Sequence, residues 1–143
     1  NIDENPDVLN ERPEGLDGTL GEALLAPHRS YLDAIMPVMS EIRGMSHITG
    51  GGFQENLPRV LPDGLAVRLD RSSWEVPALF NVIQAAGRVD EAEMFRVFNM
   101  GVGMILICAP ERAPSVLSAT DGAWKLGSVV SQTETSGNSV VIE

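Results

Sequence analysis

The chain has 143 residues, of which 43% are hydrophobic and 21% charged, and its net charge is −10. This length and composition favour one folded domain with a buried core over a disordered chain, and the negative charge disfavours nucleic acid and anionic membranes as partners. The single cysteine excludes an intrachain disulfide, and no apolar run approaches the roughly 20 residues that span a bilayer, so we expect a cytoplasmic protein.

The chain is expected to open with an irregular polar arm and a short helix. Residues 1–18 are rich in acidic side chains, proline and glycine, which is typical of a segment without regular structure. Thr19 and Glu22 have the spacing of a capping box, in which each side chain bonds the backbone N–H of the other residue. This pattern predicts a helix that begins after Thr19 and ends before Pro27.

The next elements are predicted to be a helix, a strand and a glycine loop. Asp33 is expected to cap a helix that runs through Ile42, with a proline tolerated in its first turn, and Gly44 is expected to end it. Residues 45–49 are interpreted as a strand that runs into three consecutive glycines at 50–52.

The rest of the chain alternates between predicted helices and strands. We expect Gly87 to end one helix in a left-handed conformation, and Asp90 with Glu93 to cap the next one. The most apolar run, 101–109, is expected to be a central strand. Further helices are predicted over 53–58, 76–87, 90–97 and 111–119, and further strands over 65–70, 124–130 and 140–142. The alternation favours an α/β or α+β fold, a three-layer α-β-α sandwich with a mixed β-sheet.

The segment most informative about chemistry is HITGGGF, residues 47–53. Gly50, Gly51 and Gly52 allow a left-handed backbone and a close approach to a ligand. The first N–H groups of the following helix would favour an anion at the same place, and the Thr49 hydroxyl could add a donor. The spacing fits neither a Walker loop nor a Rossmann fingerprint. The alternative is a flexible turn that is rich in glycine.

Three side chains near this loop are further candidates. His47 could transfer a proton, although a lone histidine is more often a hydrogen-bonded structural residue. Asn56 and Arg59 lie about one turn beyond the glycines. Arg59 could bind a phosphate with two parallel hydrogen bonds, or it could be an ordinary surface arginine.

A second glycine-containing segment, FNMGVGM, covers residues 98–104. Asn99 is expected at the junction between a helix and a strand, where Gly101 and Gly103 would let a ligand or another chain approach. A bulge or close packing of the sheet is the alternative reason for these glycines. No metal site is expected, because two histidines and one cysteine offer no zinc spacing.

Several motifs in this order resemble the phosphoribosylformylglycinamidine cyclo-ligase family, also called aminoimidazole ribonucleotide synthetases. They are TLGEALLAPHRSY (19–31), HITGGGFQENLPRVLP (47–62), the stretch 72–94, FNMGVGM (98–104) and WKLGSVV (124–130). The resemblance implies that residues 1–143 form one C-terminal domain and that the N-terminal ATP-binding domain is absent from this chain. The start at Asn1, without methionine, also suggests a piece of a longer protein.

The resemblance implies an activity in purine biosynthesis. Members of the family convert formylglycinamidine ribonucleotide and ATP, with Mg²⁺, into aminoimidazole ribonucleotide, ADP and phosphate. It implies that ATP and Mg²⁺ are bound mainly by the missing domain, that the enzyme is a homodimer and that this chain alone is inactive and needs no cofactor. The alternatives are a binding or dimerisation module, or another superfamily member such as a selenophosphate synthetase or a thiamine-monophosphate kinase.

The resemblance also implies roles for individual residues. It assigns the glycine loop to the ribose phosphate of the substrate, and His47 to positioning or proton transfer near the reacting amide. The chain departs from the usual family pattern at His28, Asp33 and Val97. The predicted substrate-binding residues are Thr49, Gly50, Gly51, Gly52, Asn56, Arg59 and Asn99, with Arg29, Tyr31 and Gly101 as further candidates.

Overall fold

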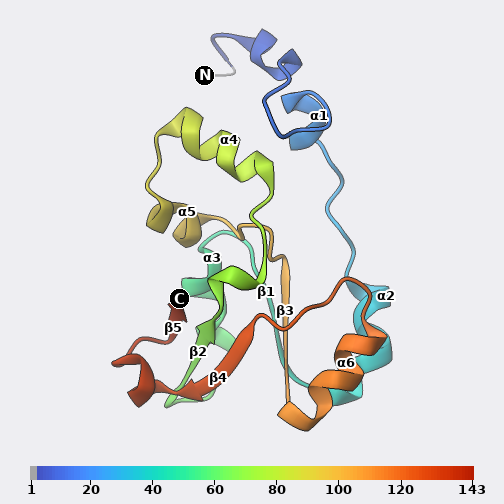
Figure 1. Ribbon diagram of the computed structural model, residues 1–143, viewed down its shortest axis with the longest axis vertical. Helices are drawn as coiled ribbons and strands as arrows, with labels where there is room; N and C mark the ends of the chain where they lie inside the picture. Colours follow the sequence, from blue (N-terminus) through green and yellow to red (C-terminus); the bar gives the residue numbers. More distant parts are fainter. Residues whose placement is uncertain (1–2) are drawn as a thin grey trace.

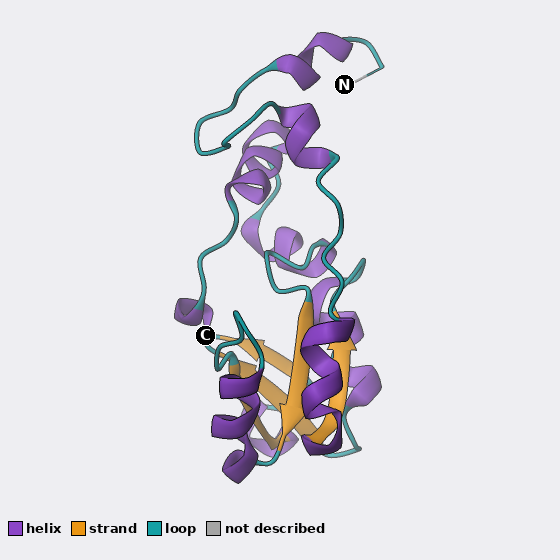
Figure 2. Ribbon diagram, turned by 90° about the vertical axis from the view of Figure 1, so that its right-hand side faces the viewer, coloured by secondary structure: helices purple, strands orange, loops and turns teal. Residues whose placement is uncertain are grey.

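The computed structural model describes residues 3–143, which form an arrangement of helices and strands (Figures 1 and 2). The strands are β1 (Ile42–His47), β2 (Leu65–Leu69), β3 (Met104–Cys108), β4 (Gly127–Ser131) and β5 (Val140–Ile142). The α-helices are α1 (Leu20–Leu24), α2 (Leu32–Ile35), α3 (Gly52–Asn56), α4 (Ala78–Gly87), α5 (Glu91–Val97) and α6 (Ala113–Ala119). Short 3₁₀ helices, η1 to η6, cover Pro6–Asn10, Met36–Glu41, Pro58–Val60, Arg71–Ser73, Pro110–Arg112 and Gln132–Thr135. None of the described helices is long and apolar enough to cross a membrane.

The strands are divided between two sheets. β1 and β3 pair antiparallel, with Ile42 opposite Cys108 and His47 opposite Met104. In the second sheet β2 lies between β4, to which it is antiparallel, and β5, to which it is parallel. Helices α2 and α6 lie on one side of β1 and β3, and α3 lies on the other (Figure 1). The predicted α+β class with a mixed sheet is therefore confirmed.

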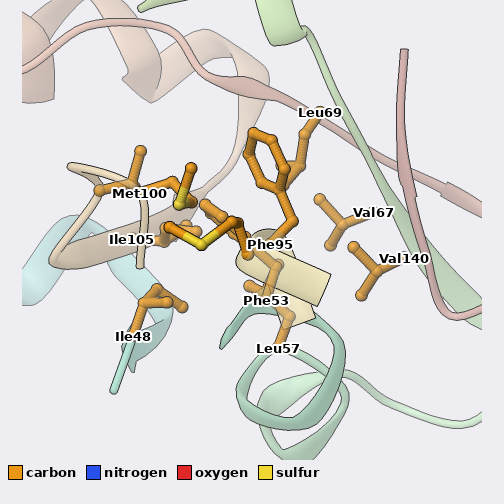
Figure 3. Close-up of a cluster of buried hydrophobic side chains, with 11 residues drawn as sticks. Ile48, Phe53, Leu57, Val67, Leu69, Phe95, Met100, Ile105 and Val140 are labelled. Atoms are coloured by element: carbon orange, nitrogen blue, oxygen red, sulfur yellow. The ribbon is translucent and has the colours of Figure 1, made fainter. Parts of the chain in front are cut away.

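The buried core draws side chains from both sheets and from α3 and α5 (Figure 3). Phe53 of α3 is fully buried, and its ring centroid lies 6.1 Å from those of Trp74 and Phe95. Burying one such side chain contributes about 1.5–3 kcal/mol to the stability of the fold. The Trp74 indole also donates a hydrogen bond of 3.0 Å to the Met100 carbonyl oxygen, which ties this cluster to the turn before β3. The core therefore fixes the two segments that carry the candidate site.

The N-terminal predictions are confirmed in part. The capping box of α1 is present, because Thr19 Oγ1 accepts from the Glu22 N–H at 3.2 Å and Glu22 Oε2 accepts from the Thr19 N–H at 2.7 Å. These bonds stabilise the carboxylate and lower the pKa of Glu22. The arm is not wholly irregular, since Pro6–Asn10 form η1. Residues 1 and 2 of the predicted arm lie outside the described residues.

The predicted helix from Asp33 through Ile42 is wrong at both ends. α2 begins at Leu32, and after four residues it changes into η2, which contains Pro37 near its start. A proline at this place cannot donate a helical hydrogen bond, which favours the change. Ile42 already belongs to β1, and Gly44 lies inside that strand, where the register shifts relative to β3. Gly44 thus accommodates a β-irregularity and does not end a helix.

Three further predictions are wrong, two at helix ends and one for a strand. Arg88, with φ of 50°, takes the left-handed position after α4 that was expected for Gly87. The Asp90 side chain makes no capping hydrogen bond; Glu93 instead binds Arg96 at 2.6 Å, which lowers the pKa of Glu93. The run 101–109 is wrong as a central strand, because β3 begins only at Met104 and pairs with β1 alone among the described strands.

Candidate functional site

The two glycine-containing segments meet where β1 ends and β3 begins. His47 is the last residue of β1 and lies opposite Met104, the first residue of β3. The Ile48 N–H donates a hydrogen bond of 2.9 Å to the Gly103 carbonyl oxygen, which joins the loop after β1 to the turn before β3. The segments 47–52 and 99–104, which are far apart in the sequence, therefore lie side by side.

The three glycines of the loop differ in what they require. Gly51 and Gly52 have φ of 90° and 54°, which alanine adopts only with strain. A Cβ at Gly52 would collide with the Phe95 carbonyl oxygen and lie 3.0 Å from that of Arg96. A Cβ at Gly50 would meet nothing within 4 Å. Gly52 is therefore needed for the packing of α3 on α5, whereas Gly50 borders open space.

Three backbone N–H groups of the loop have no hydrogen-bond acceptor among the described residues. The Gly52 N–H donates to the Thr49 carbonyl oxygen at 3.0 Å, but within residues 3–143 no acceptor is found for the N–H groups of Thr49, Gly50 and Gly51. Successive unpaired N–H groups of this kind favour an anion. Helix α3 has only five residues, so its dipole adds less than the sequence suggested.

The Asn56 side chain stabilises the conformation of the glycine loop through hydrogen bonds. Its side chain is 5% exposed, and its Nδ2 donates to the carbonyl oxygens of Gly52 at 2.7 Å and Gly50 at 3.2 Å. A longer contact of 3.5 Å reaches the Thr49 carbonyl oxygen, and Arg59 Nη1 donates to Asn56 Oδ1 at 3.3 Å. These bonds engage both the nitrogen and the oxygen of the side-chain amide. Asn56 would therefore contribute to ligand binding by stabilising the loop. A direct contact with substrate stays a prediction.

Replacing Asn56 by alanine should lower the free energy of unfolding by about 2 kcal/mol, because the buried Gly52 carbonyl oxygen loses its donor. Arg59→Ala is the matched control, since Arg59 is exposed and loses one bond of 3.3 Å, and should change that free energy by less than about 0.5 kcal/mol. Urea unfolding followed by circular dichroism measures both. Equal effects of the two substitutions would show that the loop does not depend on Asn56.

His47 belongs to a cluster of three rings. Its Nε2 lies 3.2 Å from Nε2 of His28, and the two ring centroids are 5.2 Å apart. The Tyr31 ring stands edge-on to both, with centroids 6.0 Å from His28 and 6.1 Å from His47. Both imidazoles are exposed. The structure thus brings two of the sequence-predicted residues, His47 and Tyr31, together with His28, which the sequence marked only as a departure from the family pattern.

A groove of about 370 Å³ extends from this ring cluster onto an apolar surface. Its polar end includes Arg29, whose Nη2 donates to the Asp121 carbonyl oxygen at 3.3 Å and whose guanidinium carbon lies 5.8 Å from the centroid of the Tyr31 ring. The other lining side chains are apolar: Leu32, Ile35, Met36, Met39, Met45 and Met104. The glycine loop does not line this groove. The side chain of His47, two residues before Thr49, does line it.

Asn99 and Gly101 form the turn that precedes β3. Asn99 Oδ1 accepts from the Gly101 N–H at 3.0 Å, and Gly101 has φ of 97°. A Cβ at Gly101 would lie 2.5 Å from Pro77 Cδ, so close packing explains this glycine. Gly103 has a different role, because a Cβ there would collide with the Tyr31 hydroxyl. Sequence reasoning missed that Gly103 makes room for Tyr31. Among the described residues, no three histidine, cysteine or acidic side chains gather as a metal site.

The fold and this corner define an α+β domain in which a glycine loop follows a histidine at the end of a strand. Residues 4–138 match the family model described as "AIR synthase related protein, C-terminal domain", so the chain belongs to this family.

Proteins similar to this chain carry the name of the family that the motifs predicted, which confirms that resemblance. The phosphoribosylformylglycinamidine cyclo-ligase of Desulfitobacterium hafniense (strain DSM 10664 / DCB-2) is 44% identical over 135 residues, covering 90% of this chain and 40% of that protein. The enzyme of the same name from Sorangium cellulosum is 49% identical over 132 residues, covering 87% and 38%. A chloroplastic/mitochondrial one from Vigna unguiculata is 42% identical over 128 residues, covering 86% and 33%. The chain thus spans two fifths or less of the length of these relatives.

Proposed function

We propose that this chain is the substrate-binding C-terminal domain of a phosphoribosylformylglycinamidine cyclo-ligase. The observation that carries the proposal is the placement of His47 beside a loop whose N–H groups at Thr49, Gly50 and Gly51 have no acceptor among residues 3–143. Such a corner suits a small molecule that carries a phosphate next to a group requiring proton transfer. Relatives with this enzyme name align over about nine tenths of the chain, which supports the same assignment.

The reaction would convert formylglycinamidine ribonucleotide and ATP into aminoimidazole ribonucleotide, ADP and phosphate. The N–H groups of the loop would hold the ribose phosphate, with Arg59 near enough in the chain to add positive charge. His47 would lie toward the reacting amide, where an imidazole can accept the proton lost when the amidine nitrogen attacks. Asn56 and Asn99 would keep the loop and the adjoining turn in shape.

ATP and Mg²⁺ would be bound by a part of the enzyme that this chain does not include. This chain spans 40% of the length of the Desulfitobacterium hafniense enzyme, which leaves room in that enzyme for a separate ATP-binding part. We therefore expect the chain alone to be inactive. A homodimer, a cytoplasmic location and an adjoining N-terminal ATP-binding domain also belong to this proposal.

A chimaera tests the proposed function directly. The matching 135 residues of the Desulfitobacterium hafniense enzyme would be replaced by the corresponding part of this chain. The chimaera is expected to form aminoimidazole ribonucleotide from formylglycinamidine ribonucleotide in the presence of ATP and Mg²⁺. The unmodified parent enzyme is the positive control. A chimaera that folds and associates like the parent but has no turnover would contradict the proposal.

A further inference from the structure

The contact between His28 and His47 requires the two imidazoles to play opposite roles. Their Nε2 atoms are 3.2 Å apart, which is a hydrogen-bond distance. A neutral imidazole has one N–H donor and one acceptor nitrogen. One Nε2 must therefore carry a proton while the other accepts, so the two neutral rings have to be different tautomers.

The segment that carries His28 is held by contacts of its neighbours Arg29 and Tyr31. Three residues after His28, the Tyr31 ring occupies the space that a side chain at Gly103 would fill. Between them, Arg29 donates to the Asp121 carbonyl oxygen at 3.3 Å, from the loop after α6. The segment 28–31 thus contacts the turn before β3 and the loop after α6, and it lies beside the end of β1.

The pair leaves one nitrogen of each ring for other partners. Within residues 3–143 the only side-chain hydrogen bond of His28 or His47 is the one that joins their Nε2 atoms. Nδ1 of His47 is therefore the nitrogen available to a bound molecule. If Nε2 of a neutral His47 donates to His28, Nδ1 of His47 is an acceptor. If Nε2 accepts from His28, Nδ1 of His47 carries the proton and is a donor.

We propose that His28 is a positioning residue for His47. It orients the His47 ring and selects which nitrogen carries the proton, so that Nδ1 meets the substrate in a single protonation form. An exposed imidazole without such a partner exchanges between tautomers and rotates about its side-chain bonds, and only a fraction of its population would be competent. The effect on turnover rests on the proposed function, whereas the tautomer relation does not.

The tautomers can be measured on the chain itself by two-bond ¹⁵N–¹H NMR correlations of the imidazole rings at pH 8.5. The wild-type chain should show one histidine protonated at Nε2 and the other at Nδ1. The ring protonated at Nδ1 should return to the tautomer mixture of a free imidazole when its partner is replaced. The variant for this test is His47→Leu if that ring is His28, and His28→Leu if it is His47. Identical tautomers in the wild-type chain, or an unchanged remaining ring in the variant, would overturn the proposal.

The chimaera adds a readout that distinguishes positioning from a structural role. His28→Leu should lower kcat about tenfold while KM for formylglycinamidine ribonucleotide stays within about twofold. His28→Gln, which keeps a hydrogen-bonding group at a similar reach, should restore most of the lost kcat. Equal kcat for wild type and His28→Leu would overturn the positioning role. An inactive wild-type chimaera would contradict the proposed function, and the NMR result would still decide whether His28 sets the tautomer of His47.

Discussion

Alanine at Gly52 is expected to lower the free energy of unfolding by about 3 kcal/mol. About 1 kcal/mol of this comes from forcing a residue with a Cβ into a left-handed conformation, since φ of Gly52 is 54°. About 2 kcal/mol comes from overpacking, because the new Cβ would collide with the Phe95 carbonyl oxygen. A backbone atom cannot rotate aside as a side chain can, so α3 would have to move away from α5.

Gly50→Ala is the matched control for this experiment. Gly50 belongs to the same loop, but a Cβ there meets nothing within 4 Å. The variant should unfold within about 0.5 kcal/mol of the wild type. Urea denaturation of both variants, monitored by circular dichroism, gives the comparison. If Gly52→Ala were as stable as Gly50→Ala, the loop would not be fixed by its packing on α5.

In the chimaera, His47→Ala is expected to lower kcat at least about 100-fold, the range found when a general acid or base is removed. The side chain is exposed, so its loss should leave the midpoint of thermal unfolding nearly unchanged. A steady-state assay of aminoimidazole ribonucleotide formation, run beside a thermal melt, separates lost chemistry from lost folding.

Arg43→Ala is a control on the same strand. Arg43 is exposed, lies four residues before His47 on β1 and belongs to neither the loop nor the ring cluster. Its replacement should leave kcat within about twofold of the wild-type chimaera. Similar kcat values for the His47→Ala and Arg43→Ala chimaeras would show that His47 takes no part in proton transfer.

The glycine loop could be located from the sequence, but the different roles of its glycines could not. Three glycines between an apolar segment and a helix predict an unusual backbone. A Cβ does not fit at Gly52 because of the carbonyl oxygens at the end of α5, more than 40 residues further along the chain, whereas nothing lies within 4 Å of a Cβ at Gly50. Long-range packing of this kind leaves no periodic pattern near the loop.

The same limit applies to the histidine cluster and to the sheets. His28 and His47 are 19 residues apart, and neither spacing nor amphipathic pattern indicates that their Nε2 atoms meet. The strand at 65–70 was evident from its alternation, yet its partners β4 and β5 are set by contacts along the whole chain. The left-handed residue after α4 is Arg88 and not the predicted Gly87. The geometry of the turn, and not the preference of glycine for this conformation, determines which residue adopts it.

The central claim is that the glycine loop of this chain binds the ribose phosphate of formylglycinamidine ribonucleotide, and calorimetric titration tests it most directly. The wild-type chain would be titrated beside Gly50→Val, since Gly50 lacks the left-handed backbone of Gly51 and has open space for a larger side chain. We predict saturable binding by the wild type that is at least about tenfold weaker in the variant, a loss of about 1.4 kcal/mol. Equal affinities, or no binding by the folded wild-type chain, would contradict the claim.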